Sequence, residues 1–323
     1  MERALGSKPV RVITPVYNDW ESLHLLIADL DRELERNGLS AEILVVDDGS
    51  DLSSRKTFAK KFAGPGILRI RTIRMRCNLG HQRAIVSGLT YALKNFDAEG
   101  FLTMDSDGED SPTDAVRMIK KWELDRTMAV VARRSKRSES DVFRVSYVGY
   151  KLLFRILTGR RIDFGNFCIL PRDDAETITY REEAWSHYAS SIVKARIRIA
   201  RMDVNRAKRY RGFSKMNYSS LVSHGIASLA VFLGIVLARC LVATTVLGAL
   251  FVAGMIAVVY ITSFTGYGIP GWGTTAAGVL GLALVQVLSV QIVTILVALA
   301  WRMKASEPPA VIARTYISGE VTF

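Results

Sequence analysis

The most informative stretch of this chain is Met104-Asp105-Ser106-Asp107-Gly108-Glu109-Asp110. It follows the short apolar run 101–104, which predicts a buried strand, and it precedes Ser111-Pro112, which is typical of a helix start with a capping serine and a first-turn proline. Two carboxylates two residues apart at a strand end can face the same way and leave several positions on a hard cation free. Asp105 and Asp107 are therefore candidate ligands of Mg²⁺ or Mn²⁺, and a helix-capping acidic turn is the structural alternative.

Strand-like and helix-like patterns alternate on both sides of this stretch. The expected strands are 10–16, 41–46, 67–73, 101–104 and 128–132, and the expected helices are 21–36, 51–62, 81–96 and one that begins at 111. This alternation predicts an α/β fold with an open, mostly parallel, Rossmann-like sheet and right-handed crossovers. Ligands of such sheets bind beyond the carboxyl ends of the strands.

Polar motifs follow the predicted strands at those ends. Pro15-Val16-Tyr17-Asn18-Asp19 follows the first strand, Asp47-Asp48-Gly49-Ser50 the second and Asn78-Leu79-Gly80 the third. Each motif alone is compatible with an ordinary turn. Together they bring several carboxylates to one edge of the sheet, which implies a bound cation or ligand groups that offset the repulsion.

Charge is distributed unevenly along the 323 residues, whose formal net charge is +12. Arg239 is the one charged residue between 216 and 301, and the tail after Trp301 carries +1, which leaves +10 on residues 1–215. This pattern excludes a wholly soluble globular protein, a disordered chain and a fibrous repeat. The three cysteines form neither a metal pattern nor a disulfide framework, and no signal peptide is visible at the N-terminus.

The C-terminal part predicts membrane helices. Residues 241–264 and 274–301 are charge-free, and each is longer than the roughly 20 residues that cross a bilayer core. We expect four parts: a cytosolic domain over 1–215, an interfacial amphipathic helix over 216–239, two transmembrane helices within 240–301, and a cytosolic tail over 302–323. The basic residues directly after Trp301 favour the cytosolic side for the tail. A third span through 216–238 is the alternative.

With these motifs in order, the chain resembles family 2 glycosyltransferases with the GT-A fold, and among them the polyprenyl-phosphate glycosyltransferases related to dolichol-phosphate mannose synthase. The resemblance covers about residues 1–301, and its specificity comes from the combination of motifs. Besides those quoted above, it is carried by Arg134-x-x-Arg137-x-Glu139-Ser140 and Arg206-x-x-Arg209-x-x-Gly212-x-Ser214-Lys215.

The resemblance implies a role for each motif. The nucleotide-sugar site would contain Pro15, Tyr17, Asp19, Asp48, Asn78, Arg134 and Arg137. The metal on the donor diphosphate would be held by Asp105 and Asp107. The acceptor phosphate would be bound by Arg206, Arg209, Ser214 and Lys215. Generic attraction to anionic lipid is the alternative for this last group.

Two positions depart from the family pattern. Asp107-Gly108-Glu109-Asp110 stands where relatives read Asp-Leu-Gln-Asp, and Gly165-Asn166-Phe167 stands where many read Gly-Asp-Phe, so a carboxylate sometimes proposed as base is absent. Asp163 is a candidate substitute, and an ordinary loop aspartate is the alternative. A phosphate monoester, whose second pKa is about 6, is already mostly dianionic at pH 7 and needs positioning more than proton removal.

The expected function is inverting, metal-dependent transfer of a glycosyl group from a UDP- or GDP-sugar to a polyprenyl phosphate such as undecaprenyl phosphate, for modification of cell-envelope glycans or glycolipids. We expect a multi-pass protein of the cytoplasmic (inner) membrane with no nucleic-acid partner, and the resemblance leaves a homo-oligomer open. One alternative is a membrane glycosyltransferase that acts on another lipid or glycan acceptor. Another is a non-catalytic membrane-tethered scaffold, which leaves the ordered carboxylate motifs unexplained.

Overall fold

A computed structural model describes residues 9–51, 64–134, 141–212, 218–265, 271–303 and 307–322. The chain divides into two compact units. The first contains Met1–Leu152, Arg160–Val231 and Glu307–Phe323, and the second contains Leu153–Gly159 and Phe232–Ser306. The helix expected over 51–62 lies, apart from Asp51, outside the described residues.

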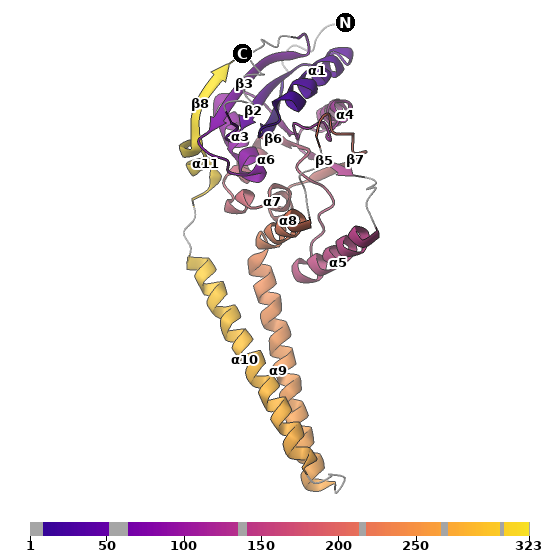
Figure 1. Ribbon diagram of the computed structural model, residues 1–323, viewed down its shortest axis with the longest axis vertical. Helices are drawn as coiled ribbons and strands as arrows, with labels where there is room; N and C mark the ends of the chain where they lie inside the picture. Colours follow the sequence, from indigo (N-terminus) through magenta and orange to yellow (C-terminus); the bar gives the residue numbers. More distant parts are fainter. Residues whose placement is uncertain are drawn as a thin grey trace. The chain divides into compact units, whose positions relative to one another are not determined.

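The first unit is built on a mixed sheet that has eight strands in the described part of the chain, in the order β7-β5-β6-β4-β1-β2-β3-β8 (Figure 1). The strands are β1 (Val10–Val16), β2 (Ala41–Asp47), β3 (Ile67–Met75), β4 (Gly100–Thr103), β5 (Ala129–Arg134), β6 (Cys168–Pro171), β7 (Ile199–Val204) and β8 (Ile317–Thr322). β6 and β8 pair antiparallel with their neighbours, and the other pairings are parallel. The expected mostly parallel sheet is confirmed.

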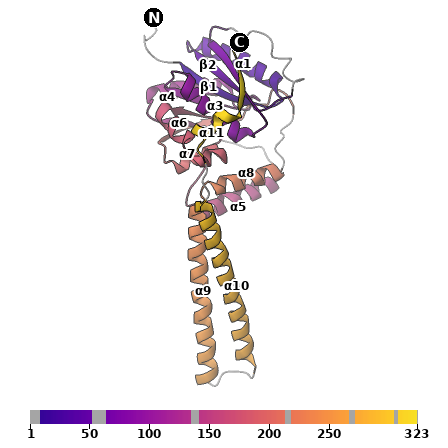
Figure 2. The ribbon, with the colours of Figure 1, turned by 90° about the vertical axis from the view of Figure 1, so that its left-hand side faces the viewer.

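Helices cover both faces of this sheet (Figure 2). The covering helices are α1 (Trp20–Arg36), α3 (His81–Asn95), α4 (Pro112–Leu124), α6 (Arg172–Thr179) and α7 (Tyr188–Lys194), with short turns at η2 (Glu182–Trp185), α11 (Pro309–Ile312) and η3 (Ala313–Tyr316). Two further helices, α5 (Asp141–Thr158) and α8 (Tyr218–Ala230), contribute none of their described side chains to the two core clusters that flank the sheet. Successive residues of β1 point to opposite faces: Val12 packs with α1 and α4, and Ile13 packs with α3. Burial on both faces explains why the central strands β1 and β2 are mostly apolar.

The loops that follow β1, β2 and β3 contact one another closely. The Asn18 side chain donates to Asp51 Oδ2 (2.9 Å) and accepts from the Asp51 amide (2.8 Å), which ties the first loop to the second. Gly49 has a φ of +76°, and a Cβ atom there would lie 2.7 Å from the Asn78 nitrogen. Glycine is therefore needed at 49 for both the backbone conformation and the close approach of the third loop.

The C-terminal tail belongs to the first unit because β8 completes its sheet beside β3. The Arg76 amide donates to Tyr316 O (2.7 Å), and Arg76 Nε donates to Thr315 O (3.0 Å). Since the segments before α9 (Leu233–Phe264) and after α10 (Trp272–Met303) both belong to this unit, the two helices must run in opposite directions across any membrane that they cross.

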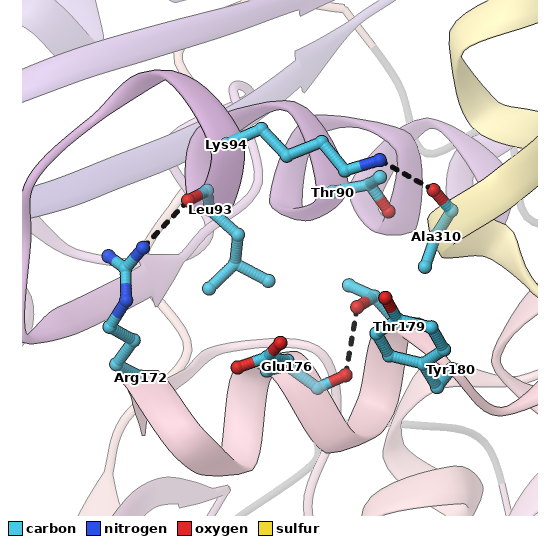
Figure 3. A pocket seen from close by; sticks show the side chains of 8 residues that line it. All are labelled: Thr90, Leu93, Lys94, Arg172, Glu176, Thr179, Tyr180 and Ala310. Carbon is cyan, nitrogen blue, oxygen red and sulfur yellow. Dashed lines mark hydrogen bonds between the residues drawn. The ribbon is translucent and has the colours of Figure 1, made fainter.

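A small pocket lies where this tail meets α3 and α6 (Figure 3). Lys94 Nζ donates to Ala310 O (2.8 Å), and Arg172 Nη2 donates to Leu93 O (2.8 Å). None of the residues predicted for the functional site lines this pocket. The bond from Lys94 ties the tail to α3, and the bond from Arg172 ties α6 to α3.

The second unit is a hairpin of α9 and α10, which are long and apolar enough to cross a membrane, with mean hydropathies of 2.4 and 2.5. The helix break falls at residues 231–232, so the segment expected to be interfacial up to 239 divides between α8 and α9. Arg239 does not end a segment: its guanidinium donates to the Ile156 carbonyl near the C-terminus of α5, which offsets the charge within an apolar helix.

A polar network joins α8 to α7 inside the first unit. His187 Nε2 lies 3.0 Å from His224 Nε2, and the Ser190 and Ser228 hydroxyls lie 2.8 Å apart. His187 Nδ1 accepts from the Ser190 amide (3.1 Å), so the neutral ring carries its proton on Nε2 and donates to His224. Burial, reinforced by His224, lowers the pKa of His187 to about 3.

We predict that Gly49→Ala destabilises the chain by roughly 2 to 4 kcal/mol, because it adds overpacking to a left-handed backbone. Gly38→Ala is the matched control: Gly38 has a φ of +65° with nothing within 4 Å of its Cβ position, so only the backbone cost of about 1 kcal/mol applies. Urea unfolding of the detergent-solubilised chain, followed by tryptophan fluorescence, measures both. Equal losses would contradict the contact between the loops.

We predict a second effect on stability, at acidic pH. The unfolded chain protonates His187 below about pH 6.5, whereas the folded chain keeps it neutral to about pH 3, so stability falls as the pH drops between these values, by at most about 1.4 kcal/mol per pH unit. His187→Asn should flatten the stability curve between pH 6.5 and 5. Parallel curves for the wild type and His187→Asn would contradict this origin.

Candidate functional site

The acidic loop, residues 105–110, follows β4 and is folded on itself by its own side chains. The Asp105 amide donates to Asp110 Oδ2 (3.0 Å), and the Glu109 amide donates to Asp107 Oδ1 (2.9 Å). Gly108 has a φ of +88°, which allows the chain to turn back between the carboxylates. The loop therefore presents its carboxylates from a defined backbone.

The basic strap, residues 205–211, runs along the acidic loop. The Ala207 amide donates to Glu109 O (3.1 Å), and the Tyr210 amide donates to Asp107 O (2.9 Å). A Cβ atom on Gly108 would lie 2.3 Å from the Tyr210 ring, so this glycine also makes room for the strap. The strap and the loop thus form one structural element, although about 100 residues separate them in the sequence.

The two arginines predicted to bind phosphate lie on this strap and pair with carboxylates of the loop. Arg209 Nη2 donates to Asp107 Oδ2 (2.6 Å), and the Arg206 guanidinium donates to Glu109 Oε2. Asp107 and Glu109 are mostly buried, with 14% and 11% of their side chains exposed. The structure brings Asp105, Asp107, Arg206 and Arg209 together, with the arginines against the acidic loop.

His81 is a member of this site that the sequence reasoning missed. It begins α3, and its Nε2 lies 3.1 Å from Asp105 Oδ1. Desolvation disfavours its charged form, but the nearby carboxylates of Asp105, Asp110 and Asp107 outweigh this effect and raise the pKa of His81. Its place directly after the Asn78-Leu79-Gly80 motif was the available signal.

Burial acts on the carboxylates of the acidic loop in the opposite direction to its effect on His81, because it raises the pKa of an acid. Desolvation, followed by the charge of Asp105, raises the pKa of Asp107, while the Glu109 amide and Arg209 oppose the increase. A carboxylate whose negative charge is costly gains most from an added positive charge. The loop is thus electrostatically prepared for a cation or for further donor groups.

Asp48 holds the loop after β3. Its Oδ1 accepts from the Leu79 amide (2.8 Å) and its Oδ2 from the Gly80 amide (3.0 Å), and only 3% of the residue is exposed. Burial raises the pKa of Asp48, although these amides partly offset the effect. In this structure Asp48 positions the third loop, and with it the start of α3.

The other predicted nucleotide residues lie on the same sheet edge. Pro15 lies in β1 beside Val46 of β2, and Tyr17 follows β1 with 43% of its surface exposed. Asp19 precedes α1 and makes no side-chain capping bond to it. Asn78 Oδ1 accepts from the Gly80 amide (3.0 Å).

The structure does not group all of the predicted residues. Asp163 pairs with Arg201 of β7 through both carboxylate oxygens (3.2 and 3.0 Å). Arg134 is the last residue of β5, and its side chain is not described. Arg137, Ser214 and Lys215 lie outside the described residues.

Asp105 and Asp107 are the residues that could hold a metal. No cluster of three or more histidine, cysteine, aspartate or glutamate side chains in the described ranges has metal-binding geometry. Two hard carboxylates nevertheless fit Mg²⁺ or Mn²⁺, which usually take the rest of their ligands from water and substrate phosphates. The donor set therefore fits a cation that a phosphate-bearing ligand helps to hold.

Comparison with known proteins identifies the fold family. Residues 11–179, from β1 to the end of α6 and including the acidic loop, match the family described as Glycosyl transferase family 2. The chain is 25% identical over 279 residues to the glycosyltransferase YkcC of Bacillus subtilis (81% of this chain, 80% of the relative). It is 28% identical over 223 residues to the undecaprenyl-phosphate 4-deoxy-4-formamido-L-arabinose transferase of Salmonella paratyphi B (67% and 65%).

Solved structures include a mannosyl-3-phosphoglycerate synthase from Rubrobacter xylanophilus, which is 15% identical with a TM-score of 0.49 and covers 69% of this chain and 72% of its own. The family match spans more than half of the chain, and the mixed sheet, with its acidic loop after β4, has the GT-A architecture expected from the sequence. The chain belongs to glycosyl transferase family 2.

Proposed function

We propose that this chain transfers a glycosyl group from a nucleotide sugar to a polyprenyl phosphate such as undecaprenyl phosphate. The observation that carries the proposal is the pairing of the acidic loop with the basic strap. The strap ends at Arg211, seven residues before α8 begins at Tyr218, and from α8 the chain continues into two apolar helices. One short segment therefore connects a diphosphate-handling loop to the part of the chain suited to a lipid.

Similarity to a transferase named for undecaprenyl phosphate supports this choice of acceptor. The loops after β1, β2 and β3 offer a site for the nucleotide at the sheet edge, where α/β folds bind such ligands. The first unit and its tail would face the cytosol at the inner membrane, where nucleotide sugars are made, and the α9–α10 hairpin would return the chain to the same side.

In the proposed reaction a phosphate oxygen of the acceptor attacks the anomeric carbon while the bond to the nucleoside diphosphate breaks, which inverts the configuration. Asp105 and Asp107 would hold a divalent cation, which offsets the charge developing on the leaving diphosphate. Arg206 and Arg209 would exchange their carboxylate partners for phosphate oxygens when substrates bind, since guanidinium groups suit both. His81 would keep Asp105 oriented.

The surroundings of positions 163 and 166 favour a phosphate acceptor over a hydroxyl acceptor. A hydroxyl must lose a proton during the attack, so it gains from a carboxylate base, whereas a phosphate monoester is already ionised near neutral pH. Asn166 supplies no carboxylate, and Asp163 is held by Arg201. Arg201 thus keeps the substitute base in an ion pair.

We predict sugar transfer from a UDP- or GDP-sugar to undecaprenyl phosphate, and none to undecaprenol. The chain in detergent micelles is incubated with a panel of radiolabelled donors, and lipid-linked radioactivity is measured for each acceptor. Transfer to undecaprenol or to a free glycan with equal efficiency would contradict the acceptor assignment.

We also predict that Asp105→Ala and Asp107→Ala each lower kcat by at least about a hundredfold, because each removes a carboxylate from the proposed cation site. The matched control is Asp203→Ala, which breaks an exposed ion pair with Arg133 on β5 and should retain most of the activity. Release of nucleoside diphosphate in Mg²⁺ and Mn²⁺ provides the measurement. Undiminished turnover in both loop variants would exclude the assigned role.

A further inference from the structure

Asn166 lies close to the end of β4, which leads into the acidic loop. β4 and β6 pair antiparallel, with Thr103, the last residue of β4, opposite Cys168, the first residue of β6, so the chain that enters β6 passes the end of β4. The Thr103 hydroxyl also donates to the backbone carbonyl of Asn166. The Gly-Asn-Phe segment therefore adjoins the acidic loop at the C-terminal end of β4.

The first two residues of α3 contact Asp105 and Asn166. His81 bonds to Asp105, and the next residue, Gln82, donates from Nε2 to Asn166 Oδ1 (3.2 Å). Gln82 Oε1 accepts from the Tyr188 amide at the start of α7 (2.7 Å). The first turn of α3 thus contacts the Asp105 carboxylate through His81 and the Asn166 amide through Gln82.

These contacts fix which way the Asn166 amide faces. A backbone N–H can only donate, so the Gln82 atom that meets Tyr188 must be the oxygen, and the Gln82 atom that meets Asn166 must be the NH₂ group. Asn166 must then present its oxygen to Gln82 and direct its own NH₂ group elsewhere. In the described part of the chain, that NH₂ group donates to no other residue.

We propose that Asn166 uses this NH₂ group to donate a hydrogen bond to a phosphate oxygen of a bound substrate, and that Gln82 is the positioning residue that keeps the donor end in place. The inference rests on the proposed function, since it assigns a phosphate ligand to the same site. An aspartate here would direct a carboxylate oxygen toward the ligand, beside a loop that already carries four carboxylates, and would repel phosphate.

The two residues predict a distinctive order of effects. Asn166→Asp replaces the donor with an acceptor directly. Gln82→Glu exchanges the donor for an acceptor indirectly. One oxygen of the new carboxylate still accepts from the Tyr188 amide, and the other requires a donor. Asn166 then turns its NH₂ group toward residue 82 and its oxygen toward the ligand. Gln82→Ala only removes the orientation, so a positioning role makes alanine less harmful than glutamate, whereas a merely structural role makes it at least as harmful.

The experiment measures donor KM, acceptor KM and kcat for the full-length chain in micelles, and by calorimetry the binding of UDP, GDP and farnesyl phosphate without turnover. Asn166→Asp and Gln82→Glu should each weaken one phosphate ligand about tenfold or more, with Gln82→Ala in between. A change in farnesyl phosphate binding and acceptor KM identifies the lipid phosphate, and a change in nucleotide binding and donor KM identifies the donor diphosphate. Asn95→Asp, an amide-to-carboxylate change at the other end of α3, should alter neither.

Wild-type binding of both phosphate ligands by Asn166→Asp and Gln82→Glu, or greater harm from alanine than from glutamate at 82, would overturn the inference. The calorimetric binding measurements distinguish a failure of this inference from a failure of the proposed function. If the wild type transfers sugar to a hydroxyl acceptor and not to undecaprenyl phosphate, the proposed acceptor is wrong, and the inference still stands or falls on the binding of the nucleotides and farnesyl phosphate.

Discussion

The structure depends on the accumulation of negative charge at the end of β4. Four carboxylates lie within the six residues of the acidic loop, and burial raises the pKa of Asp107 among them. Such a loop requires compensation from elsewhere in the chain. His81 comes from the start of α3, and Arg206 and Arg209 come from the basic strap.

This need for compensation links the sheet to the C-terminal part of the chain. The strap that neutralises the loop is the last described segment before α8, and the apolar helices α9 and α10 follow α8 in the chain. Asp48, which holds the third loop, also fixes the start of α3 and hence His81 and Gln82. The tail supports the same region from the far edge, since η3 bonds to Arg76 at the end of β3.

The sequence was sufficient for β1 to β5 and for the acidic loop. The apolar residues of these strands and the polar residues after them report local structure and burial directly. The strands β6, β7 and β8 were not predicted. β6 and β8 pair antiparallel and β7 pairs parallel with β5, and each of these pairings depends on a partner far away in the chain.

Within the site, the contacts missed by sequence reasoning were those between distant residues. Nothing in the His81-Gln82 dipeptide shows that its side chains contact Asp105 and Asn166. Likewise, nothing in the sequence near Asp163 shows that it forms an ion pair with Arg201. The start of α9 was misplaced for a similar reason. The charge of Arg239 suggested a segment end, whereas a carbonyl group of α5, about 80 residues earlier, accommodates it.

In the proposed reaction the acidic loop would exchange its internal cationic partners for a metal-bound diphosphate. Mn²⁺ binding to the full-length chain, followed by electron paramagnetic resonance with and without UDP or GDP, tests this most directly. Because the proposed metal site contributes two carboxylates, Asp105 and Asp107, we expect weak binding of Mn²⁺ alone, at least tenfold tighter binding with one of the nucleotides, and loss of this gain in Asp105→Ala. Mn²⁺ binding that is indifferent to both nucleotides, or unchanged in Asp105→Ala, would contradict the account.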